Sequence, residues 1–201
     1  MKKPMIIDIH GHYTTAPKAL ENWRNQQIAG IKDPALSPKV ADLRISDDEL
    51  RESIESNQLK LMKERGSDLT IFSPRASFMA HHIGDFNVSS TWAAICNELC
   101  YRVSRLFPDS FIPAAMLPQS PGVAPATCIP ELDRCVKEYG NVGINLNPDP
   151  SGGHWTSPPL RRANENSSRS RAKAASPAVD PTLSAVKMRA RGKNSIFSSM
   201  Q

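Results

Sequence analysis

Short apolar segments alternate with longer amphipathic segments along the first 150 residues, and this order constrains the fold more than any other feature. The apolar segments are rich in β-branched residues and predict strands. The segments between them repeat apolar residues at helical spacing and predict helices. The predicted strands cover residues 5–12, 69–72, 111–117 and 142–147, and the predicted helices cover 19–28, 46–66, 92–107 and 130–139.

Strands that alternate with helices form parallel βα units. Because crossovers between parallel strands are right-handed, only an open doubly wound sheet or a (β/α)8 barrel remains. Each predicted strand ends in a polar loop rich in proline or glycine, which favours a barrel with a site on its C-terminal face. A barrel usually needs about 250 residues and eight units. We therefore expect an α/β fold that is a partial (β/α)8, TIM-barrel-like structure of about four βα units.

The first predicted strand ends in His10-Gly11-His12. Residues i and i+2 of a strand point to the same side, so the two imidazoles can face one point. Gly11 lets the backbone approach its neighbours closely. Two converging neutral imidazoles are half of a typical zinc or transition-metal site. The alternative is two polar side chains where a strand enters a loop; the position at the strand end favours the metal site.

The apolar runs and the cysteines indicate the compartment in which the protein is expected. No apolar run approaches the ~20 residues of a membrane span, and the one after Lys3 is too short for a secretory leader. The cysteines form no Cys-x-x-Cys pair, and Cys96 and Cys100 lie at helical spacing in an apolar context. Buried reduced thiols are the expected state. We expect a cytoplasmic protein with no membrane partner.

The net charge of +5 is unevenly distributed. Residues 161–201 carry nine Lys and Arg against two acidic residues, whereas residues 1–160 carry 16 basic and 18 acidic residues. From residue 161 the chain is rich in Ser, Ala and Arg and has no apolar period. Such a segment cannot bury enough surface to offset its chain entropy. We expect a folded domain at 1–160 and a disordered basic tail at 161–201.

Four motifs in order resemble the 4-oxalomesaconate hydratase family of the amidohydrolase superfamily, over roughly residues 4–160. They are His10-Gly11-His12, Ile71-Phe72-Ser73-Pro74-Arg75-Ala76-Ser77, Met116-Leu117-Pro118-Gln119-Ser120-Pro121 and Asn145-Leu146-Asn147-Pro148-Asp149-Pro150. The resemblance implies a zinc-dependent hydro-lyase of protocatechuate and gallate breakdown in bacteria, with a small carboxylic acid as substrate. It matches His10 and His12 to the first two metal ligands; another divalent metal in place of Zn²⁺ stays open. The resemblance also allows for a homo-oligomer.

The remaining ligands of that family fall beyond the resemblance, and the basic tail stands where the family continues. We therefore expect a truncated, weakly active or inactive enzyme. Our hypothesis is that a frameshift near Leu160 produced an out-of-frame tail, because the apolar period and the charge change abruptly there. Translating the other two reading frames of the coding DNA after codon 160 tests this hypothesis. If neither frame encodes a continuation that resembles the family, the hypothesis is refuted.

Five residues are candidate substrate ligands. Arg75 follows the second strand, and a guanidinium matches a carboxylate bidentately; a surface arginine at a turn is the alternative. Ser73 and Ser77 flank it and could share the anion. Asn145 and Asn147 lie on one face at the end of the fourth strand and could bind carboxylate or carbonyl oxygens. Capping of the turn that follows is their alternative role.

Two other functions remain open. One is a decarboxylase or hydrolase of a related acid within the same superfamily. The other is a non-catalytic fragment whose basic tail binds nucleic acid or another polyanion. The tail lacks the aromatic residues that accompany nucleic-acid binding, apart from Phe197. Nucleic acid is therefore not the expected partner.

Overall fold

The computed structural model describes residues 3–75 and 78–147. The chain divides into two units, Met1–Leu160 and Arg161–Gln201. The second unit lies outside the described residues. The predicted disorder and origin of the 161–201 segment therefore stay predictions.

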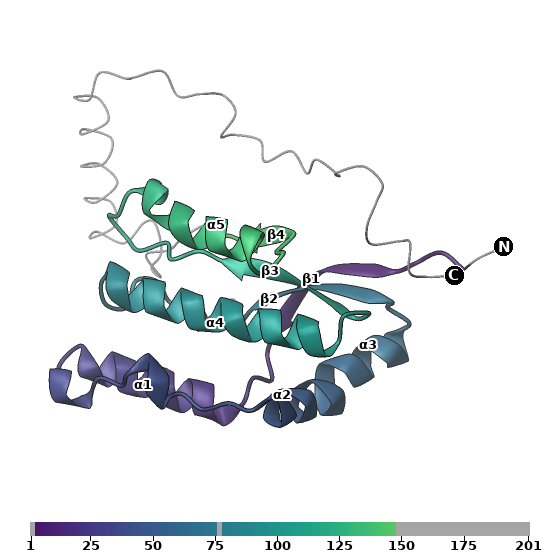
Figure 1. Ribbon diagram of the computed structural model, residues 1–201, viewed down its shortest axis with the longest axis horizontal. Helices are drawn as coiled ribbons and strands as arrows, with labels where there is room; N and C mark the ends of the chain where they lie inside the picture. Colours follow the sequence, from purple (N-terminus) through teal and green to yellow (C-terminus); the bar gives the residue numbers. More distant parts are fainter. Residues whose placement is uncertain (1–2, 76–77, 148–201) are drawn as a thin grey trace, which may run out of the picture. The chain divides into compact units, whose positions relative to one another are not determined.

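Four parallel strands form one sheet in the order β1-β2-β3-β4. Their bounds are β1 Ile7–Tyr13, β2 Leu69–Pro74, β3 Phe111–Met116 and β4 Gly143–Asn145. The spatial order of the strands follows chain order, and helical segments connect each strand to the next, as Figure 1 shows. The prediction of βα units that make part of a barrel is confirmed.

The described residues form five α-helices where four were predicted, because the segment 46–66 is divided in two, and their bounds differ from those predicted. They are α1 Lys18–Gly30, α2 Asp47–Ser53, α3 Leu59–Arg65, α4 Phe86–Leu106 and α5 Ile129–Lys137. Helix α4 begins six residues earlier than expected because the Asp85 side chain accepts a hydrogen bond from the amide of Val88, 3.0 Å away. The predicted loop between α1 and α2 contains two short 3₁₀ turns, Pro34–Leu36 and Val40–Asp42.

The segment predicted as one helix over 46–66 is α2 and α3 joined by a π turn, Ile54–Gln58. It begins with a capping box, in which Ser46 Oγ accepts from the Glu49 amide and the Glu49 carboxylate accepts from the Ser46 amide. It ends at Gly66, which has a φ of +72°. Both ends were predicted from the sequence. The π turn was not, because hydrophobic spacing does not register one extra residue in a turn.

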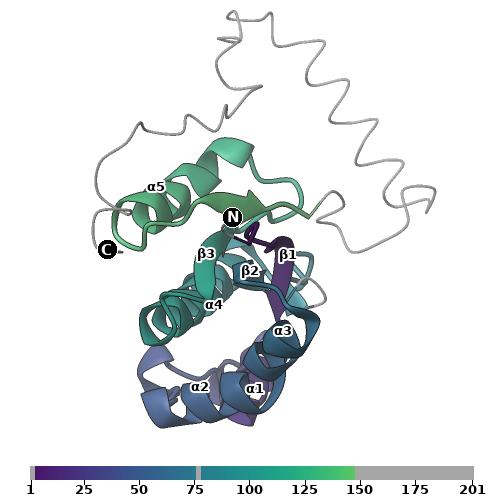
Figure 2. The ribbon, with the colours of Figure 1, turned by 90° about the vertical axis from the view of Figure 1, so that its right-hand side faces the viewer.

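The core lies between the sheet and the outer helices, with α4 in the middle (Figures 1 and 2). Trp92 of α4 is fully buried and stacks on Trp23 of α1, with ring centroids 6.4 Å apart. Leu50 and Ile54 are also fully buried, and Phe72 of β2 reaches the same core from the sheet. Cys96 and Cys100 are buried free thiols, as predicted. Among the described residues, no helix combines the length and apolar character that crossing a membrane requires.

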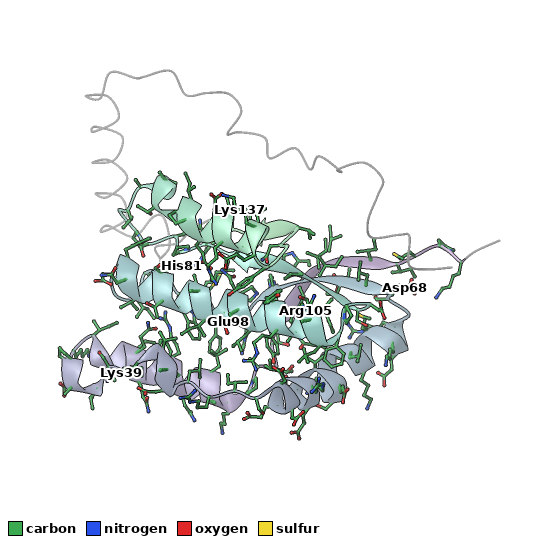
Figure 3. All side chains as sticks on the ribbon, in the orientation of Figure 1. Lys39, Asp68, His81, Glu98, Arg105 and Lys137 are labelled. Carbon is green, nitrogen blue, oxygen red and sulfur yellow. The ribbon has the colours of Figure 1, made fainter. Side chains whose placement is uncertain are left out.

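The interpretation of β1 as a buried strand is wrong for its apolar side chains. Ile7 is 46% exposed and Ile9 is 75% exposed. The reason is that β1 is an edge strand: it pairs with β2 on one side only. Its start is fixed nonetheless, because Asp68, labelled in Figure 3 beside β2, accepts a hydrogen bond of 2.7 Å from the Ile6 amide.

Candidate metal centre

The two histidines of β1 face each other. His10 Nε2 lies 3.1 Å from His12 Nε2, and the two rings meet edge to face. A tetrahedral zinc ion with Zn–N bonds of about 2.0–2.1 Å holds two ligand nitrogens roughly 3.3 Å apart. The two nitrogens are within hydrogen-bond distance, and their separation is also close to the one that a shared cation would impose. The prediction that the imidazoles point to one place agrees with this geometry.

Gly11 lets β1 approach β2 at this point. A β-carbon built on Gly11 would lie 2.1 Å from Thr70 Cγ2 and 3.1 Å from the carbonyl oxygen of Ile71. The strand register also shifts between Asp8 and Gly11, which marks a local irregularity in the β1–β2 ladder. Any side chain at position 11 would therefore push the histidine-bearing end of β1 away from β2.

The second ring nitrogen of His12 is held by β2. His12 Nδ1 lies 2.8 Å from Ser73 Oγ and 3.1 Å from the carbonyl oxygen of Pro74. Ser73 Oγ can donate one hydrogen bond, and the Gly11 carbonyl lies 3.0 Å from it as an acceptor. The serine oxygen then accepts from Nδ1–H of His12. This tautomer leaves the Nε2 lone pair directed toward His10.

Asn145 extends the same hydrogen-bonded cluster to β4. Its Nδ2 donates to Ser73 Oγ across 3.3 Å. His12, Ser73 and Asn145 thus join the C-terminal ends of β1, β2 and β4. Ser73 is buried, His12 is partly buried and His10 is exposed. We name this group, with His10, the imidazole cluster.

The electrostatics of the imidazole cluster favour a neutral His12. Burial lowers the pKa of His12, and the hydrogen bond to the Pro74 carbonyl partly opposes the shift. The neighbouring His10 lowers the pKa further, and the Asp8 carboxylate raises it. A neutral imidazole is the form that binds a metal ion.

The other predicted substrate ligands lie outside the cluster. Arg75 is exposed at the end of β2, with its guanidinium carbon 4.9 Å from the centroid of the Phe78 ring. It lines a cavity of about 90 Å³ between the strand ends, α1 and α4. Ser77 falls outside the described residues.

Gln119, which the sequence did not single out, fixes the main chain of Asn147. Gln119 Oε1 accepts from the Asn147 amide at 2.7 Å, and Gln119 Nε2 donates to the Asn147 carbonyl at 3.1 Å. The sequence feature that could have pointed to Gln119 is its position in the polar Pro-Gln-Ser-Pro segment that follows β3.

His10 and His12 fit a metal ion as two nitrogen ligands at the right separation. Between residues 3 and 147, apart from the undescribed pair 76–77, no group of three or more His, Cys, Asp or Glu side chains could enclose one. Structural and catalytic zinc sites use three or four protein ligands. The described part of the chain therefore supplies an incomplete coordination sphere.

Comparison with known proteins agrees with this fold. The model of the Amidohydrolase family matches residues 7–186. A 2-keto-4-carboxy-3-hexenedioate hydratase from Sphingobium sp. (strain NBRC 103272 / SYK-6) is 57% identical over 156 residues, which are 78% of this chain and 45% of that protein. The crystal structure of 4-oxalomesaconate hydratase LigJ from Rhodopseudomonas palustris matches at 74% identity with a TM-score of 0.71, over 84% of this chain and 50% of that one.

The fold extends to more distant proteins. A 5-carboxyvanillate decarboxylase from Novosphingobium aromaticivorans, solved with bound manganese, aligns with a TM-score of 0.50 at 17% identity, over 81% of this chain and 48% of that one. The chain spans about half the length of the relatives it matches. The family match covers most of the sequence, and the two hydratases are 57% and 74% identical over the parts that align. The chain belongs to the amidohydrolase family.

Proposed function

We propose that this chain forms the N-terminal half of a metal-dependent hydro-lyase that hydrates 4-oxalomesaconate or a closely similar unsaturated carboxylic acid. The observation that carries the proposal is the pair of Nε2 atoms 3.1 Å apart at the C-terminal end of β1. Parallel α/β barrels build their sites at that end. The identity to two hydratases supports the reaction class.

The cation that His10 and His12 would hold is Zn²⁺, with Mn²⁺ or Fe²⁺ as alternatives. Imidazole nitrogen suits all three metals, and paired histidines are common zinc ligands. A bound cation of this kind supplies Lewis-acid polarisation and lowers the pKa of bound water. The role of the chain is to present the two nitrogens in the neutral, correctly oriented form, which the Ser73 and Pro74 contacts of His12 Nδ1 favour.

The substrate is a polycarboxylate, and Arg75 is our candidate for its clamp. Arg75 is exposed at the end of β2, and its guanidinium can donate two parallel hydrogen bonds to a carboxylate. We propose that Ser73, Ser77, Asn145 and Asn147 share this role. The Ser73 hydroxyl already donates to the Gly11 carbonyl and accepts from His12 Nδ1 and Asn145 Nδ2, so it would bind substrate in exchange for one of these hydrogen bonds.

We place the protein in the cytoplasm, because its four cysteines are free buried thiols, as expected in a reducing compartment. An assembly of several copies stays a prediction. Since the described residues contribute two metal ligands, we expect weak metal binding and little turnover from this chain alone.

The test measures metal binding and activity on the purified 201-residue chain. We expect one Zn²⁺ to bind in a competition assay with a chromophoric chelator, and binding to vanish in His10→Ala and His12→Ala. The matched control is His82→Ala, an exposed histidine on the loop before α4. Zinc binding that survives in both β1 variants would refute the metal centre.

Activity is followed with 4-oxalomesaconate and, separately, with 5-carboxyvanillate. We expect slow hydration of the first, lost in His12→Ala, and no decarboxylation of the second. Hydration at the rate of a full-length relative would refute the expectation of weak activity. Decarboxylation without hydration would replace the hydratase proposal with the decarboxylase alternative.

A further inference from the structure

The π turn Ile54–Gln58 lies beside the segment that carries the metal motif. π turns are rare inside α-helices and often occur at functional sites. An α-helix advances about 100° per residue, so one extra residue turns all later side chains by roughly that angle. The π turn therefore determines which side chain of the α2–α3 helix faces the end of β1. In this chain that side chain is Gln58.

Gln58 uses both ends of its amide on the last residues of β1 and the residues that follow. Its Nε2 donates to the His12 carbonyl and lies 3.3 Å from Thr14 Oγ1. Its Oε1 accepts a hydrogen bond of 2.8 Å from Thr15 Oγ1. The side chain thus connects three positions of the segment that leaves β1.

Ser53, directly before the π turn, adds two contacts to the same segment. Its carbonyl lies 2.9 Å from Thr15 Oγ1, and its hydroxyl lies 2.7 Å from the Tyr13 hydroxyl. Residues 12–15 are therefore all hydrogen-bonded to the helix at or next to its π turn. These residues come 38 to 46 positions earlier in the chain than their partners.

We propose that Gln58 is a positioning residue for the metal centre, and that the π turn is the feature that brings it there. This inference rests on the proposed function, since it requires His10 and His12 to hold a cation. His12 is fixed from two sides: β2 holds the ring through Nδ1, and Gln58 holds the main chain through the carbonyl. Gln58 sets where His12 Nε2 lies relative to His10 without itself contacting the cation.

The test compares Gln58→Leu with Gln58→Glu. Leucine removes both hydrogen-bonding ends at similar volume. Glutamate keeps the acceptor for Thr15 and replaces the donor to His12 with a second acceptor. Loss of a residue that orients a ligand typically costs 10–100-fold in metal affinity. We expect at least a tenfold rise in the Zn²⁺ dissociation constant for both variants, and an altered visible absorption spectrum of the Co²⁺-loaded chain.

The matched control is Glu55→Gln, an exposed position in the same π turn. It should bind Zn²⁺ and Co²⁺ like the wild type. Thermal unfolding of each variant is measured without metal. A purely structural role for Gln58 predicts a lower melting temperature with an unchanged Zn²⁺ affinity and Co²⁺ spectrum, and that result would overturn the inference. If Gln58→Leu does not fold, Gln58→Glu decides by the same readouts.

The outcomes separate this inference from the proposed function. If the wild-type chain binds Zn²⁺ through His12 and the Gln58 variants bind equally well, only the positioning role of Gln58 fails. If the wild type shows no His12-dependent binding, the metal centre fails, and the role of Gln58 fails with it.

Discussion

His81 makes the stability of the fold depend on pH. It lies on the loop before α4, fully buried, with Nδ1 2.6 Å from the Ser89 hydroxyl (Figure 3). Its Nε2 is buried without a hydrogen-bond partner among the described residues. Burial lowers the pKa of His81 to about 4, and the charges of Arg24 on α1 and of the adjacent His82 add to the shift. The folded state therefore holds this imidazole neutral.

The size of the effect follows from the two pKa values. An unfolded histidine titrates near pH 6.5, so between pH 6.5 and 4 the unfolded chain binds one more proton at position 81 than the folded chain. Above pH 6.5 the titration of His81 costs the folded state nothing. As the pH falls from 6.5 toward 4, the free energy of unfolding decreases progressively, because protonation of His81 favours the unfolded chain. Between pH 7.5 and 5.0 the loss is about 2 kcal/mol in the free energy of unfolding.

The assay is urea unfolding followed by tryptophan fluorescence at pH 7.5 and 5.0, at constant ionic strength. Trp92 is fully buried and reports the core directly. His81→Gln cannot titrate, so we expect it to lose about 2 kcal/mol less than the wild type between these pH values. His82→Gln, an exposed neighbour that makes the smallest contribution to the His81 shift, should lose nearly as much as the wild type. Equal losses in all three proteins would refute the assignment of the pH dependence to His81.

Three further predictions concern packing beside the sheet and in the core. Gly11→Ala should destabilise the fold and weaken metal binding, because its β-carbon would lie 2.1 Å from Thr70 Cγ2; Thr70→Ser removes that methyl and should restore part of the loss, measured by thermal unfolding and Zn²⁺ titration. Asn97→Ala should cost about 1–3 kcal/mol in urea unfolding, because buried Asn97 bonds both the amide and the carbonyl of Met116, and a loss below 0.5 kcal/mol would contradict this. Leu50→Ala should cost about 2–5 kcal/mol in the same assay, since Leu50 is fully buried; a variant as stable as wild type would contradict this, because even a collapsed site loses the transfer free energy of the removed side chain.

Local patterns in the sequence predicted the strands, most helix positions and the facing arrangement of the His10–His12 pair. Hydrophobic spacing predicted the four strands and the helices between them, because each element buries one face at its own period. The Ser46–Glu49 capping box and Gly66 predicted both ends of the α2–α3 segment, since caps act within one turn. The i, i+2 spacing of His10 and His12 placed both imidazoles on one side of β1, because a strand has a period of two.

The tertiary structure alone decided how the imidazole cluster is held. Ser73 is 61 positions from His12, and Gln58 is 46 positions from it. Contacts at such separations depend on the register between β1 and β2 and on the phase of the α2–α3 helix after its π turn. Neither the strand register nor the rotation of the helix after the π turn can be recognised from hydrophobic periodicity in the sequence. The exposure of Ile7 and Ile9 likewise follows from the edge position of β1, which depends on the strands paired with it and not on its own residues.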